Sequence, residues 1–162
     1  MNEIESSLSI LYDSFGIMNR ICWRGELPPC LLRMSHRLSP RTGAYAQKRF
    51  GGDLRIVFNA ALCRHLDDSD FLQLMAHEMI HIRQFSLGRR GGHGRDFQSE
   101  QLRLGLAPGR EIPQDSPMSY VFFMHRLKEL HPAGAARKIA AHRNHGKDEI
   151  DYFNRFTNRR DH

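Results

Sequence analysis

The sequence contains few cysteines and no long apolar run. Its three cysteines, Cys22, Cys30 and Cys63, are odd in number and form no CxxC pair, which argues against a disulfide framework and against a zinc ribbon. No apolar stretch approaches the roughly 18 residues that would cross a membrane. The opening segment MNEIESSLSI is acidic where a secretion signal is basic. We therefore expect a cytoplasmic protein without a membrane partner, and a nucleoid or nuclear location stays open.

Basic residues outnumber acidic ones, and the excess is unevenly distributed. The formal net charge is +6, and the segment 20–64 holds nine Lys or Arg residues against Glu26 and Asp53. Such a surplus favours a polyanionic partner such as DNA, although a solvated basic face is equally compatible with it. The length and the ordinary hydrophobic fraction of 40% indicate one compact domain, which we expect to be a monomer. The residues that we nominate for substrate or DNA binding are Arg41, Arg49, Arg89 and Arg90.

The spacing of apolar residues predicts an α+β fold. Apolar residues three and four positions apart indicate a helix over 2–20, and three short β-prone runs separated by Gly and Pro turns indicate a small antiparallel three-stranded sheet. We expect this sheet to pack on a helix over 70–87, with additional helices before and after it. The expected strands are 30–35, 44–50 and 54–59, and the other expected helices are 93–106, 120–130 (with a strand as the alternative), 133–143 and 149–156.

The pentapeptide HEMIH, His77 to His81, lies inside the helix expected over 70–87. Its two histidines are four positions apart, so both imidazoles project from one helix face and are close enough to bind one ion. In an HExxH motif the histidines ligate zinc, and the glutamate, here Glu78, acts as the general base toward a water molecule. A zinc ion would lower the pKa of that water toward about 7, which is metallopeptidase chemistry.

Two residues compete for the role of third ligand. His93 follows His81 after eleven residues and is preceded by Gly91 and Gly92, which would let the chain fold back to the ion. Glu100 follows after eighteen residues, a distance typical of gluzincins, but a carboxylate there could equally form a surface ion pair with Arg103 or Arg95. Cys63 and Asp96 are candidates for a fourth ligand, which would close the site and make it structural.

The metzincin pattern is absent. Gln84 and Leu87 stand where that pattern has its glycine and its third histidine.

From Asn19 to Phe97 the sequence resembles the SprT-like metallopeptidases, whose members include a protease of DNA–protein crosslinks. The resemblance implies that His77, His81 and His93 are zinc ligands and that Glu78 is the base. We expect a peptidase core over 1–112, followed by a basic, mainly helical extension over 113–162 that packs on the core or is appended to it. The paired CxxC motifs of the family's C-terminal zinc ribbon are missing after Leu106. The matching segments are WRGELPP (23–29), LLRMSHRLSPRTGAY (31–45), LRIVFNAAL (54–62), HEMIH (77–81) and GGHGRDF (91–97).

We therefore expect a zinc-dependent endopeptidase that cleaves polypeptides and acts near DNA. The run 54–59 is expected to form the sheet edge along the cleft, where an extended substrate would add as a strand. Tyr45 and Tyr120 are alternatives for a hydrogen bond to the developing oxyanion. Two other functions stay open: a non-catalytic DNA-binding or interaction module that zinc only stabilises, and a peptidase directed at one host protein as an effector or counter-defence factor.

Overall fold

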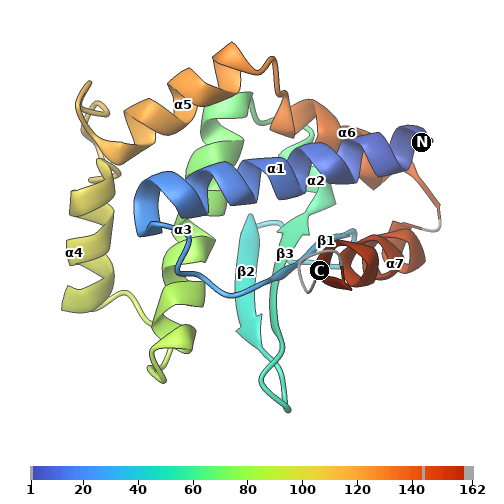
Figure 1. The fold of residues 1–162 in the computed structure, drawn as a ribbon, viewed down its shortest axis with the longest axis horizontal. Coiled ribbons are helices and arrows are strands. Elements are labelled where there is room, and N and C mark those ends of the chain that lie inside the picture. Colours follow the sequence, from blue (N-terminus) through green and yellow to red (C-terminus); the bar gives the residue numbers. More distant parts are fainter. Residues whose placement is uncertain (1, 144, 159–162) are drawn as a thin grey trace.

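The computed structural model describes residues 2–143 and 145–158. Over these residues the chain forms seven helices and one three-stranded sheet, so the expected α+β class is confirmed (Figure 1). None of these helices combines the length and apolar character that a membrane crossing would need. In chain order the elements are α1 Glu3–Trp23, β1 Leu31–Ser35, β2 Ala44–Lys48, β3 Leu54–Asn59, α2 Ala60–Cys63, α3 Asp68–Ser86, α4 Arg95–Leu104, α5 Pro117–Leu127, α6 Pro132–Ala141 and α7 His145–Asn158.

The sheet is mixed, and the expectation of an all-antiparallel sheet was wrong. Its strand order is β1-β3-β2, with β2 antiparallel to β3 and β1 parallel to it. The connection 36–43 is long enough to cross the end of β3, so β3 inserts between two strands that are neighbours in the sequence. Asn59 holds this crossing in place, because its side-chain amide donates to the carbonyl oxygens of Ser39 and Thr42 at 3.1 and 2.8 Å.

The edge of the sheet nearest α3, the helix that carries HEMIH, is β2. The expectation that 54–59 forms this edge was wrong, because β3 is the central strand. Hydrogen bonds from Asn59 N to Gly43 O and from Arg49 N to Asp53 O show which residue pairs of β2 and β3 are hydrogen-bonded. These are the pairs of the odd-numbered residues of β2. The backbone groups of the even-numbered residues, Ala44, Ala46 and Lys48, therefore point away from β3. These three residues therefore carry the outer hydrogen-bonding groups of β2.

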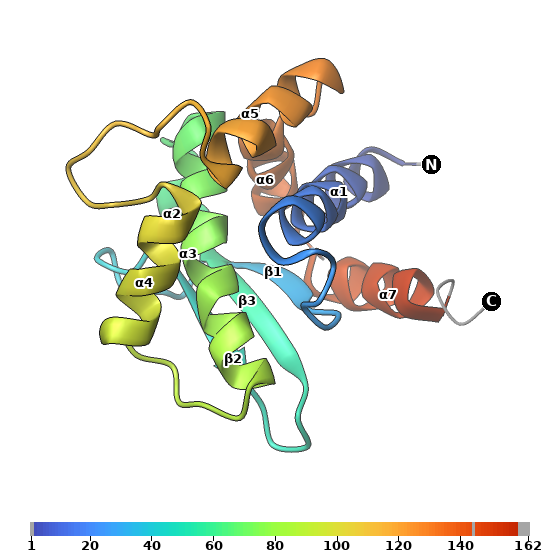
Figure 2. The same ribbon diagram turned by 60° about the vertical axis from the view of Figure 1, so that its left-hand side comes forward.

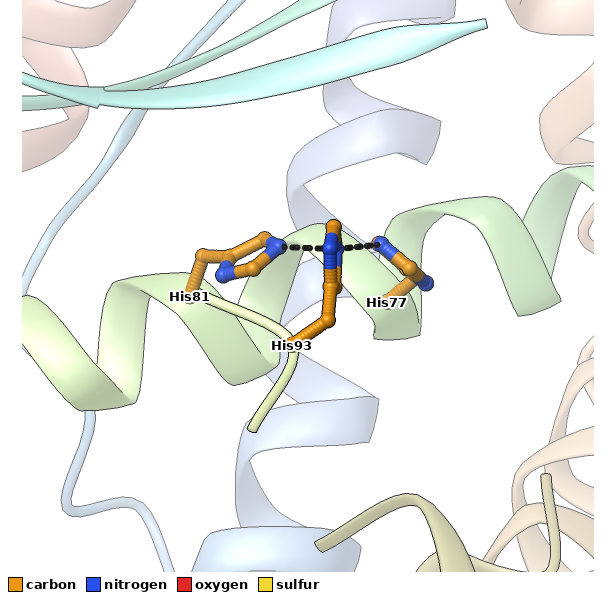
Figure 3. Close-up of side chains that lie close together, drawn as sticks. All are labelled: His77, His81 and His93. Carbon is orange, nitrogen blue, oxygen red and sulfur yellow. Dashed lines mark hydrogen bonds between the residues drawn. The ribbon is translucent and has the colours of Figure 1, made fainter. Parts of the chain in front are cut away.

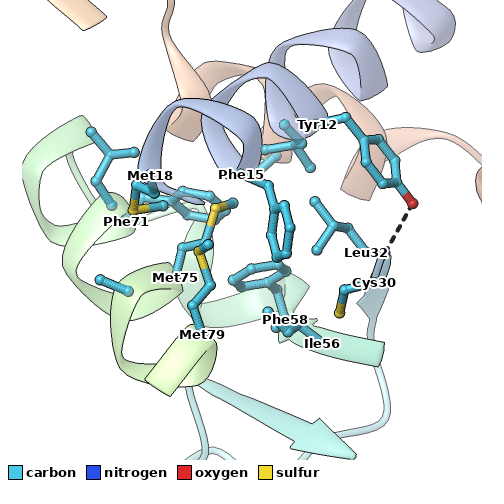
Figure 4. Close-up of a cluster of buried hydrophobic side chains, with 14 of the residues drawn as sticks. Tyr12, Phe15, Met18, Cys30, Leu32, Ile56, Phe58, Phe71, Met75 and Met79 are labelled. Atoms are coloured by element: carbon cyan, nitrogen blue, oxygen red, sulfur yellow. Dashed lines mark hydrogen bonds between the residues drawn. The ribbon is translucent and has the colours of Figure 1, made fainter. Parts of the chain in front are cut away.

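The main hydrophobic core lies between α1, α3 and the sheet (Figure 4). Phe15 on α1, Met75 on α3 and Phe58 on β3 meet there, and Met75 and Phe58 are completely buried. Helix α3 runs between α4 and the sheet (Figure 2). The HExxH helix is thereby held by packing on both sides.

The helix boundaries follow the local sequence. The Asp67 carboxylate caps α3 by accepting a hydrogen bond from Asp70 N at 2.8 Å, and the chain leaves this helix at Gly88, which has a φ of 74°. The segment expected as either helix or strand is the helix α5, which begins with Ser116 as its N-cap and Pro117 in its first turn. The short helix α2 was not predicted, and the Asn59 side chain caps it.

The C-terminal helices pack on the rest of the chain. Ala133, Ala136 and Ile139 on α6 belong to the same buried cluster as the residues of α1. Helix α7 lies along β1, on the opposite side of the molecule from α4 (Figures 1 and 2). The division into a core over 1–112 and an extension over 113–162 stays a prediction, and residues 144 and 159–162 of that extension lie outside the described residues.

Candidate metal centre

Three histidines from two segments converge beside α3. His77 and His81 lie one turn apart on α3, and His93 lies on the loop that leads to α4. His93 Nε2 is 3.2 Å from His77 Nε2 and 3.1 Å from His81 Nε2, and Figure 3 shows the three rings pointing toward one another. Within the described residues, this is the group of histidine, cysteine and carboxylate side chains whose ligand atoms lie within 4.8 Å of one another.

The spacing of these nitrogens fits a tetrahedral metal ion. Ligands at bonds of about 2.0–2.1 Å around a tetrahedral zinc lie roughly 3.3 Å apart. The two measured distances from His93 are close to this value. The group could therefore hold a metal ion.

The Phe97 ring packs against all three imidazole rings. It is 1% exposed, and its ring centroid is 4.7 Å from the ring centroids of His77, His81 and His93. Phe97 lies in the first turn of α4. Helix α4 therefore positions both the Phe97 ring and the end of the loop that carries His93. In the sequence, Phe97 shares the matching segment GGHGRDF with His93, but its contact with His77 and His81 was not predicted.

The surroundings of His77 and His81 favour the neutral imidazole, which is the state that binds a metal. Burial, followed by the nearness of His81 and His93, lowers the pKa of His77 to about 4. Burial also lowers the pKa of His81, against an opposing hydrogen bond to Gln84. Both groups can therefore offer a lone pair at neutral pH.

Glu78 lies on the side of α3 that faces β2. Its side chain is buried, and burial raises its pKa to about 7, although a hydrogen bond from the backbone N–H of Ala46 opposes that shift. Ala46 carries one of the outward-pointing backbone groups of β2. The carboxyl group thus lies between the HExxH helix and the open edge of the sheet.

Glu100, the alternative third ligand, is engaged elsewhere. Its Oε2 accepts hydrogen bonds from Trp23 Nε1 at 3.0 Å and from Arg103 Nη2 at 2.9 Å. Burial alone would raise its pKa, but the hydrogen bonds from Arg103 and Trp23 hold that pKa below its usual range. Glu100 therefore joins α4 to the end of α1 and is not part of the histidine group.

The two candidates for a fourth ligand also lie outside the group. Cys63 is fully buried in the hydrophobic core, and Asp96 pairs with Arg89 Nη1 at 2.6 Å. Among the described residues, no fourth protein ligand joins the three imidazoles.

A cavity of about 700 Å³ adjoins the histidines on the side of α4. His77 and His93 form part of its wall, so a molecule in the cavity would touch the metal centre. The remaining wall is apolar apart from two glutamines and one arginine: Phe97, Gln98, Gln101, Leu102, Ala107, Pro108 and Arg110.

The nominated arginines are all exposed but differ in their environment. Arg89 is bound to Asp96 beside the metal loop, whereas Arg41 and Arg49 lie on the connections at the two ends of β2 and Arg90 lies on the loop before His93. Of the two tyrosines considered for the oxyanion, Tyr45 lies in β2 next to Ala46, and Tyr120 lies on α5 and is 55% exposed.

Comparisons with known proteins point to one family. A search of curated proteins and a search of solved structures each returned no match. The model of the SprT-like family matches residues 11–116, which include the whole sheet, the HExxH helix and the loop with His93. Since this match covers more than half of the 162 residues, the chain belongs to the SprT-like family.

Proposed function

We propose that the protein is a zinc-dependent endopeptidase whose zinc is held by His77, His81 and His93. The observation that carries the proposal is the convergence of three imidazoles at tetrahedral spacing. The absence of a fourth protein ligand among the described residues supports an open coordination position, which distinguishes a catalytic zinc site from a structural one. Imidazole nitrogens are ligands that zinc commonly binds in proteins. Membership of the SprT-like family is consistent with a peptidase.

In the proposed reaction, Glu78 is the general base and later the general acid. A bound zinc ion would supply an electrophile that acidifies water and polarises the scissile carbonyl. Glu78 takes a proton from the attacking water and passes it to the leaving amine. A pKa of about 7 suits both steps, because a group with a pKa near the working pH can accept and release a proton with similar ease.

The surroundings of the centre favour an extended polypeptide as substrate. The outward backbone groups of Ala44 and Lys48, and the outward carbonyl of Ala46, whose N–H is bound to Glu78, offer hydrogen bonds to a peptide strand, which would then lie beside β2 next to Glu78. On the other side of the histidines, the 700 Å³ cavity would receive a side chain of the same peptide. Recognition through the backbone would make cleavage tolerant of sequence.

The test compares the wild type with Glu78→Gln, using Glu111→Gln as the control. Glu111 is an exposed loop residue, so its substitution removes the same charge away from the centre. We expect all three proteins to contain one zinc per chain, and we expect Glu78→Gln alone to lose cleavage of an unfolded protein substrate by a factor of at least about 100. Cleavage by Glu78→Gln at the wild-type rate would reject the mechanism, and a chain that takes up no zinc would reject the site.

We also propose that DNA associates with three exposed arginines, Arg41 and Arg49 at the two ends of β2 and Arg90 on the loop before His93. Arg41, Arg49 and Arg90 are exposed, and none of them forms an ion pair with another described residue. The affinity for DNA should fall steeply with salt, and a triple substitution of these arginines by Glu should abolish it. Zinc and DNA binding without any cleavage would favour the alternative function, a zinc-stabilised interaction module.

A further inference from the structure

Gln84 connects the metal helix to the loop that carries His93. It lies three residues after His81 on α3 and is 4% exposed. Its Oε1 is 2.7 Å from His81 Nδ1, and its Nε2 donates to the Gly92 carbonyl oxygen at 3.0 Å. A longer hydrogen bond of 3.4 Å runs from Gly92 N to the same Oε1. The buried amide of Gln84 therefore contacts the imidazole of His81 and the backbone of Gly92, which directly precedes His93.

The backbone of Gly92 determines which way the Gln84 amide faces. The Gly92 carbonyl oxygen can only accept, so it must face the amide nitrogen of Gln84, and the Gly92 N–H can only donate, so it must face Oε1. Oε1 is itself only an acceptor. The hydrogen bond between Oε1 and His81 therefore requires a proton on His81 Nδ1.

This proton leaves His81 Nε2 with a free lone pair. Nε2 is the nitrogen that lies 3.1 Å from His93 Nε2, on the side where the three imidazoles meet. A ring protonated on Nε2 instead would turn an N–H toward the metal position and could not ligate. The hydrogen bond on one side of the ring thus selects the tautomer that binds on the other side.

The loop approaches Phe85 of α3 closely enough to favour glycine at position 91. A Cβ added at Gly91 would lie 2.9 Å from Phe85 Cζ and 3.6 Å from His81 Nδ1, whereas a Cβ at Gly92 would meet nothing within 4 Å. A side chain at 91 would therefore require the loop or the Phe85 ring to shift, and a shift of the loop would lengthen the contacts between Gln84 and Gly92.

We propose that Gln84 is a positioning residue, which fixes the metal-binding tautomer of His81 and ties the loop of His93 to α3. The proposal rests on the proposed function in so far as the histidines bind zinc. It goes beyond that function, because it assigns the preorganisation of the site to a side chain that is not itself a ligand.

The first test measures zinc affinity by competition with a chromogenic chelator. Gln84→Leu keeps the size of the side chain and removes all three hydrogen bonds, and we expect it to weaken zinc binding about 10- to 100-fold. Gln84→Glu keeps an acceptor for His81 Nδ1, so we expect it to bind zinc several-fold more tightly than Gln84→Leu. Gln73→Leu on the same helix, where the native amide bonds only the neighbouring Ser69, is the matched control and should bind like the wild type.

The second test is made on the metal-free wild type and does not depend on any variant folding. Nitrogen-15 shifts of the ring at neutral pH should report His81 protonated on Nδ1. A proton on Nε2, or zinc binding by a folded Gln84→Leu that equals the wild type, would overturn the proposal.

The outcomes for positioning and for catalysis are separable. A loss of zinc affinity in Gln84→Leu combined with a wild type that cleaves no protein would support the role of Gln84 and reject the peptidase. Cleavage by a wild type whose zinc affinity does not respond to Gln84→Leu would do the reverse.

Discussion

Replacing Glu100 by Leu should destabilise the fold without removing the metal. The substitution leaves Trp23 Nε1, on a ring that is only 5% exposed, without its acceptor at 3.0 Å. A buried donor without a partner costs about 1–3 kcal/mol. The Arg103 side chain is 44% exposed and can be rehydrated, so its lost ion pair adds at most about 1 kcal/mol. We therefore expect the free energy of unfolding to fall by about 1–4 kcal/mol.

Denaturant unfolding of the metal-free protein measures this change, and chelator competition measures zinc affinity on the same samples. Because Trp23 and Glu100 interact directly, the double variant with Trp23→Phe should be more stable than the sum of the two single effects by about 1 kcal/mol. Glu111→Leu controls for the loss of a surface carboxylate. If Glu100→Leu unfolds like the wild type but no longer takes up zinc, then Glu100 is a ligand and the assignment to His93 is mistaken.

Three further predictions follow from the described contacts. Gly91→Ala should weaken zinc binding because its Cβ would meet Phe85, whereas Gly92→Ala should leave the affinity unchanged, and equal effects of the two would contradict the loop packing. Removing the metal with a chelator should stop cleavage, and an excess of zinc of about 100 times Kd should stabilise the fold by about 3 kcal/mol, measured as a rise in Tm. Burial raises the pKa of Glu149 from its ordinary 4.5 to about 7, against opposing contacts from Met34 N and Arg33. The folded state then binds the proton more tightly than the unfolded chain, so the free energy of unfolding should fall as pH rises from about 4.5 to about 7, and a Glu149→Gln variant with the same slope would refute this origin.

The residues of the candidate site were visible in the sequence because their chemistry depends on local spacing. HEMIH places two imidazoles on one helix face whatever the rest of the fold does. His93 could be selected over Glu100 only through the family resemblance, since both lie at workable distances along the chain. The structural reason that Glu100 is not in the histidine group is its hydrogen bond with Trp23, which lies 77 positions away in the sequence. No local sequence pattern indicates such a contact. For Gln84, the sequence indicated only a departure from the metzincin pattern, which has glycine at this position.

The order and direction of the strands could not be read in the same way. Alternating apolar residues identify a strand and its buried face, but not its neighbours in the sheet. The crossing of 36–43 over the end of β3 depends on the hydrogen bonds of Asn59 to Ser39 and Thr42, and such loop contacts leave no periodicity. The expected antiparallel pairing was therefore correct for β2 and β3, which are joined through Gly51 and Gly52, and wrong for β1.

The two edge strands of the sheet differ in how far side chains bind their outer backbone groups. On β1, the outward N–H groups of Leu32 and Met34 are taken by the Tyr12 hydroxyl and the Glu149 carboxylate, at 3.0 and 2.8 Å, and His145 Nε2 lies 3.1 Å from the Met34 carbonyl oxygen. An uncovered strand border invites other chains to attach and can seed aggregation. Because helices α1 and α7 mask one border with side chains, self-association through the sheet is confined to β2, where any guest strand must lie beside Glu78.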